Sequence, residues 1–167
     1  RPHVSLLKDF PELSNKFLLV NGLSKGFAMT GWRVGYLAGP MNVVSIVKSL
    51  QSHSSTCIPG FIEDAAVVAL NAGEPLLKDD VNKLRKRREL AIQTMDRLGG
   101  FKYIRPQGAY YIFIDVRDKL GPGRTTVQLS EQLLVEHHIA MAPGEAFGCP
   151  GWIRLSYAVS DATITEG

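Results

Sequence analysis

The sequence has little of several features that mark particular classes of protein. Its only cysteines, Cys57 and Cys149, are too few for a disulfide framework or a thiolate zinc site. The formal net charge of +3 is too small to indicate a nucleic-acid partner by itself. No apolar run approaches the about 20 residues that cross a bilayer. We therefore expect no metal ion, no nucleic-acid partner and no membrane partner, and the reducing cytoplasm is the simplest location.

What remains is the composition of an ordinary globular protein, with 45% hydrophobic and 21% charged residues. One basic cluster, at positions 83–88, allows two interpretations. It could be a patch for nucleic acid or nuclear targeting, or the solvated face of an amphipathic helix. Asp79, Asp80 and Glu89 offset part of its charge. We favour the solvated helix face.

Residues 21–35, with the sequence NGLSKGFAMTGWRVG, concentrate the chemistry of the chain. Lys25 lies in an apolar, glycine-rich stretch, and Arg33 follows it near two glycines. A lysine reacts as a nucleophile only when it is neutral, which desolvation or a neighbouring cation favours. Glycines let the backbone approach a ligand, and a guanidinium can grip a phosphate with two parallel hydrogen bonds. The pattern favours a phosphorylated aldehyde held as a Schiff base on Lys25 and anchored by Arg33, over a surface lysine beside a structural Gly-Trp turn.

These residues resemble the pyridoxal-phosphate lysine signature of the class I/II aminotransferases, which are aspartate aminotransferase-like enzymes of PLP fold type I. The resemblance implies that pyridoxal 5'-phosphate is the cofactor and that Lys25 is the catalytic residue that holds it. It also implies that Arg33 binds the cofactor phosphate and that the hydroxyl of Ser24 adds a further contact. Gly22 stands where relatives often carry a phosphate-binding serine.

A second signature lies at residues 143–158, with the sequence PGEAFGCPGWIRLSYA. It resembles the small-domain segment of the same family, in which the arginine before Leu-Ser binds the substrate α-carboxylate. The resemblance gives that role to Arg154, and a planar guanidinium at a strand start suits a carboxylate. An ordinary ion pair at a strand end is the alternative for Arg154.

Hydrophobic patterns predict a loop at 11–15 followed by a short buried strand at 17–20. Further strands are predicted at 33–38, 109–116 and 152–159, and helices at 42–52, from Pro59 to about 70, over 81–98 and at 125–138. We place a domain boundary at residues 71–73. By the resemblance, residues 1–72 are the C-terminal end of the large PLP-binding domain, and residues 73–167 are the interdomain helix and small C-terminal domain.

The implied fold class is α/β: the end of the large-domain mixed sheet of PLP fold type I, plus an α+β small domain. Because members of the family are far longer chains, the sequence is expected to be a C-terminal fragment. The fragment alone is expected to have little or no transaminase activity, since half of the cofactor pocket is missing.

The resemblance implies an aminotransferase that moves an amino group between an amino acid and a 2-oxo acid, and a homodimer as the complete chain. Two alternatives stay open. The first is another fold type I enzyme, a β-lyase or a decarboxylase. The second is the ligand-sensing domain of a transcription regulator. The sequence does not name the amino acid.

Overall fold

The computed structural model describes residues 4–166. The chain divides after Asp79 into two compact units, residues 1–79 and 80–167, and each has a buried apolar cluster of its own. Among the helices formed by the described residues, none combines the length and the apolar character needed to cross a membrane.

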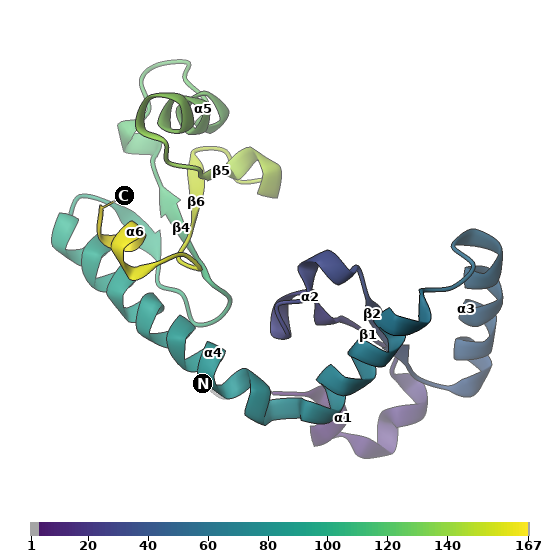
Figure 1. The fold of residues 1–167 in the computed structure, drawn as a ribbon. Helices are drawn as coiled ribbons and strands as arrows, with labels where there is room; N and C mark the ends of the chain where they lie inside the picture. Colours follow the sequence, from purple (N-terminus) through teal and green to yellow (C-terminus); the bar gives the residue numbers. More distant parts are fainter. Residues whose placement is uncertain (1–3, 167) are drawn as a thin grey trace. The chain divides into compact units, whose positions relative to one another are not determined.

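The first unit is built around a two-stranded antiparallel hairpin, in which Leu19 pairs with Ala38 and Gly22 with Gly35. Its cluster contains Leu23, Met29, Val34 and, from the long helix, Ala69. In chain order the elements are α1 (Leu6–Asp9), the 3-10 helix η1 (Pro11–Lys16), β1 (Leu19–Gly22), α2 (Leu23–Gly26), the 3-10 helix η2 (Thr30–Trp32), β2 (Gly35–Ala38), α3 (Met41–Ser54) and the first part of α4 (Gly60–Leu98) (Figure 1).

Three predictions for this unit need correction. The strand predicted at 17–20 begins at Leu19 and is not buried, since Val20 is 71% exposed. It belongs to a sheet of only two strands within the described residues, so it has a neighbouring strand on one side only. The predicted loop at 11–15 lies in η1. The strand predicted from Arg33 begins at Gly35, because Arg33 has a left-handed backbone with φ 53°.

The two predicted helices on either side of residues 71–73 are assigned to one element, α4, which contains a kink. Gly73 breaks the helical geometry with φ 57° and ψ −146°, and Pro75 follows inside the helix. A left-handed φ favours glycine, and a proline cannot donate the backbone hydrogen bond that would continue a regular helix. The predicted domain boundary therefore falls at the kink, whereas the compact units divide later, after Asp79. That boundary stays a prediction.

The second unit contains a four-stranded antiparallel sheet in the order β3-β4-β6-β5. Figure 1 shows α6 beside the C-terminal part of α4, where Nε of Arg87 lies 3.2 Å from a carboxylate oxygen of Asp161. Besides the end of α4, the elements are β3 (Lys102–Ile104), β4 (Tyr111–Asp115), the 3-10 helix η3 (Arg117–Lys119), α5 (Thr126–His137), β5 (Ala142–Pro143), the 3-10 helix η4 (Gly144–Phe147), β6 (Trp152–Ser156) and α6 (Asp161–Glu166).

The sheet buries one face and leaves the other partly open. Ile112, Ile114 and Ile153 are at most 4% exposed and form a cluster with Ala91 and Met95 of α4. Successive side chains of a strand point to opposite faces, so the residues between these isoleucines lie on the open face. The predicted helix end at Leu98 is confirmed. Of the apolar side expected for the helix at 81–98, Ala91, Ile92 and Met95 are buried, whereas Val81 and Leu98 at its two ends are 50% and 64% exposed.

Alanine at Gly144 should destabilise the second unit. A Cβ there would lie 2.5 Å from the carbonyl oxygen of Trp152 and closer still to that of Cys149, and backbone atoms cannot move away cheaply. We expect Gly144→Ala to lower the free energy of unfolding of the full-length protein by about 2 kcal/mol in urea denaturation. Gly121→Ala is the control, because a Cβ at Gly121 meets nothing within 4 Å. Equal stability of the two variants would contradict the prediction.

Candidate functional site

Lys25 lies in the single-turn helix α2, within residues 23–34, the loop that connects β1 to β2. Leu23 and Met29 of this loop are only 1% and 8% exposed and belong to the core of the first unit. The backbone N–H of Leu23 also donates to the carbonyl oxygen of Val34, at 3.3 Å. Lys25 lies between the two buried residues and is itself exposed. The hydrophobic anchors therefore fix the backbone and leave the amine accessible.

Arg33 closes this loop in a strained conformation. Its backbone has φ 53°, and Ala28 in the same loop has φ 52°. A left-handed φ in a residue other than glycine costs of order 1 kcal/mol and is concentrated at functional sites. The Nη1 of Arg33 donates to the carbonyl oxygen of Thr30, at 3.0 Å. This bond orients the guanidinium without neutralising it.

The donors on the loop suit an anion. Ser24 supplies a hydroxyl, Lys25 an amine and Arg33 a guanidinium, all within one short connection. Neither Lys25 nor Arg33 forms an ion pair with a carboxylate among residues 4–166. Two uncompensated cations and a hydroxyl match the charge and hydrogen-bonding needs of a phosphate group. The residues present therefore fit a phosphorylated cofactor.

Close approach of the two strands explains why β2 begins with a glycine. A Cβ on Gly35 would lie 2.8 Å from the carbonyl oxygen of Asn21 across the ladder. One residue further along β2, the hydroxyl of Tyr36 accepts a hydrogen bond of 3.4 Å from the side-chain amide of Asn21. The sequence predicts no role for Tyr36. An aromatic residue in a strand gives no local sign that its hydroxyl will contact Asn21 of the neighbouring strand.

Arg154 lies on the open face of the sheet, in the second unit, opposite Phe113 of β4. Its guanidinium carbon is 4.1 Å from the ring centre of Tyr111 and 4.4 Å from that of Phe147. Trp152, on the same face, stacks on Phe113 with ring centres 5.1 Å apart. Arg154 forms no ion pair within the described part of the chain. The described residues therefore do not provide the strand-end ion pair that was the alternative for Arg154, and aromatic rings surround its guanidinium instead.

A glutamate that the sequence analysis did not single out joins η4 to α5. One carboxylate oxygen of Glu145 accepts from the backbone N–H of Thr126 at 3.0 Å, and the other accepts from the Thr126 hydroxyl. The start predicted for this helix is confirmed, since Thr125 is its N-cap and forms a capping box with Gln128. The hydrogen bond from the Thr126 hydroxyl holds the pKa of Glu145 below its ordinary value. Glu145 and Thr126 are far apart in sequence, so no local pattern predicts the contact.

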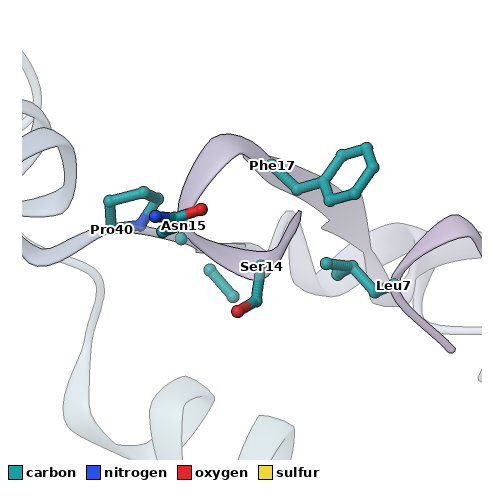
Figure 2. A pocket seen from close by; sticks show the side chains of 7 residues that line it. Leu7, Ser14, Asn15, Phe17 and Pro40 are labelled. Atoms are coloured by element: carbon teal, nitrogen blue, oxygen red, sulfur yellow. The ribbon is translucent and has the colours of Figure 1, made fainter. Parts of the chain in front are cut away.

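A pocket in the first unit is separate from the residues with predicted roles. Figure 2 shows Leu7, Ser14, Asn15, Phe17 and Pro40 around it, and Ala38 and Gly39 complete the lining. None of these side chains is a titratable acid or base, so the lining offers no group for general acid or base chemistry and none that could activate the hydroxyl of Ser14.

The structure places Ser24, Lys25 and Arg33 on one loop of the first unit and Arg154 on the sheet of the second. The cofactor and substrate roles of these residues stay predictions, as does the grouping of Arg154 with the other three.

Comparisons with known proteins identify the family. The model of the family described as aminotransferase class I and II matches residues 3–167. The chain belongs to this family.

Its relatives include an aspartate aminotransferase from Streptomyces avermitilis, which is 36% identical over 94% of this chain and 40% of the relative. A probable aspartate/prephenate aminotransferase from Aquifex aeolicus is 40% identical, over 93% of this chain and 40% of the relative. A solved structure of a Thermus thermophilus aspartate aminotransferase double mutant superposes with a TM-score of 0.82 at 34% identity, over 94% of this chain and 41% of that one.

These neighbours confirm the predicted fold class, because the chain has the fold of the corresponding part of PLP fold type I aspartate aminotransferases. The chain spans about 40% of the length of the curated relatives that it matches.

Ionised Glu145 should stabilise the protein in a pH-dependent way. Since folding lowers the pKa of Glu145 from its ordinary 4.5, the contribution is fully present above that pH. It is lost as the pH falls through the lower value of the folded state. We expect Glu145→Gln to be less stable than wild type at neutral pH, with a difference that shrinks on acidification, in urea denaturation of the full-length protein. The control is Glu131→Gln, which changes an exposed glutamate of α5. A difference that does not vary with pH would contradict the assignment.

Proposed function

We propose that the full-length protein is a PLP-dependent aminotransferase that transfers an amino group between an amino acid and a 2-oxo acid. The observation that carries the proposal is the loop between β1 and β2. It presents the amine of Lys25 and the guanidinium of Arg33 without a carboxylate partner among the described residues. Lys25 would hold the cofactor through its amine, while Arg33 and Ser24 would hold the phosphate group.

The chain's own contribution to the reaction is positioning and proton transfer. Pyridoxal 5'-phosphate, when bound, supplies the electron sink that stabilises negative charge at the substrate Cα. Nζ of Lys25, once free, would take up the proton that leaves Cα and later return one, acting as general base and then general acid. The buried anchors Leu23 and Met29 would keep that amine in a fixed place during both transfers.

Arg154 would bind the α-carboxylate of the substrate and so orient the bond that breaks. Its support by two aromatic rings leaves the positive charge available to the ligand. L-Aspartate is the first amino donor to test, with 2-oxoglutarate as acceptor, because several relatives are named aspartate aminotransferases. Prephenate is the second acceptor to test, since the relative from Aquifex aeolicus is named for it.

We further propose that residues 1–72 belong to the large domain and residues 73–167 to the interdomain helix and small domain, in a cytoplasmic homodimer. The first unit leaves large apolar side chains exposed. Met41 is 79% exposed, Ile46 62% and Phe61 68%. Exposed apolar surface of this kind supports burial in a larger assembly.

Lys25→Ala should abolish covalent attachment of the cofactor. Borohydride reduction of the wild-type full-length protein with pyridoxal phosphate, followed by peptide mapping, should give one labelled lysine, Lys25. The variant should give no label there and lose transaminase activity, since no other group can replace the amine at that place. Lys16→Ala, on η1, is the control and should retain the label. Labels scattered over surface lysines in wild type would overturn the proposal.

Arg154→Lys should weaken substrate binding more than it lowers the rate at which the bound substrate reacts. Lysine keeps the charge but loses the two parallel hydrogen bonds of a guanidinium to a carboxylate. We expect KM for L-aspartate to rise about tenfold, the equivalent of about 1.4 kcal/mol, with a smaller change in kcat. Arg97→Lys, in the last turn of α4, serves as the control. An unchanged KM would remove Arg154 from the site.

A further inference from the structure

The surroundings of Arg154 include a residue of η4, a short segment outside the strand β6 that carries Arg154. Phe147 is the last residue of η4, and its ring centre lies 4.4 Å from the guanidinium carbon of Arg154. Phe147 is 44% exposed, so burial alone does not hold it. Its position must come from the backbone of η4 and from contacts with its neighbours.

Two features fix that backbone. At the start of η4, Gly144 is buried against the carbonyl oxygens of Cys149 and Trp152, and its own carbonyl accepts from the N–H of Cys149 at 2.9 Å. Next to it, Glu145 reaches across to α5 and accepts both hydrogen bonds that Thr126 donates. Thr126 is fully buried in the first turn of a 12-residue helix.

The contact between Glu145 and α5 consists of two hydrogen bonds to a charged carboxylate. The carboxylate accepts a backbone N–H at the helix start, where the helix dipole favours negative charge. Charge-assisted hydrogen bonds of this kind are shorter and stronger than those between neutral groups. The helix is itself fixed by the capping box of Thr125 and Gln128. Glu145 thus ties η4 to an element that does not carry Arg154.

We propose that Glu145 is a positioning residue for the substrate carboxylate. By binding Thr126 it holds η4 so that the ring of Phe147 lies against Arg154, which presets the guanidinium for the ligand. The inference rests on the proposed function of Arg154. Glu145 does not touch the substrate in this scheme and acts only through Phe147. Presetting a side chain raises affinity by reducing the flexibility lost on binding.

The test measures the binding of maleate to the full-length protein by titration calorimetry. Maleate is a dicarboxylate without an amino group, so binding is measured without reaction. We expect Glu145→Ala to weaken maleate binding about fivefold, the size of a typical cation–π contribution. Glu145→Gln should keep most of the affinity, because its amide can still bond both groups of Thr126. The control Glu131→Ala, on the exposed surface of α5, should bind like wild type.

A double-variant comparison shows whether the effect passes through Phe147. Phe147→Ala should weaken binding by a similar factor, and adding Glu145→Ala to it should cause little further loss. Fully additive losses, or a Glu145→Ala variant with wild-type affinity, would overturn the positioning role.

An Arg154→Ala variant separates the two proposals. If it binds maleate like wild type, the proposed role of Arg154 fails and this inference with it, whereas the aminotransferase proposal itself is tested by the labelling of Lys25. If it loses affinity while Glu145→Ala does not, only the inference fails.

Discussion

Burial of alternate residues on β4 and β6 is the constraint on which the second unit depends. Ile112, Ile114 and Ile153 pack in one cluster with residues of α4, and the side chains that alternate with them along the strands therefore point to the opposite face of the sheet. That face receives Phe113 opposite Arg154 as a direct consequence of the register. A shift by one residue would bury the guanidinium and expose the isoleucines. The register that buries the isoleucines therefore also places the candidate substrate-binding arginine on the open face.

The first unit holds the segment that carries the candidate residues Lys25 and Arg33 with few buried residues. Its cluster is small, yet it includes Leu23 and Met29 on either side of Lys25, and Ala69 of α4 packs against them. The left-handed φ of Arg33 then turns the chain into β2. Strain of this kind persists only where the surroundings impose it. Here the antiparallel pairing from Gly22 with Gly35 onward provides that support.

What the sequence predicts well is what depends on neighbours along the chain. Helix ends at Leu98 and at Thr125 follow from glycines and a capping residue, and the structure has both. The exposure of Val20 could not be predicted, because a strand's burial depends on which strands and helices cover it. The contact of Glu145 with Thr126 could not be predicted either, since tertiary folding alone brings them together. Local motifs identify the candidate residues Lys25, Arg33 and Arg154, but they do not identify the groups that hold these side chains in place.

Those supports share one property that bears on function. Arg33 is held by a carbonyl oxygen and Arg154 by aromatic rings, so each is oriented by neutral groups. By contrast, Arg87, Arg105 and Arg117 each pair with an aspartate. A carboxylate partner would orient a guanidinium equally well but would cancel the charge that a phosphate or carboxylate ligand must meet. Neutral support fixes the direction of the donors and leaves the charge for the ligand, which is what an anion-binding arginine requires and a structural one does not.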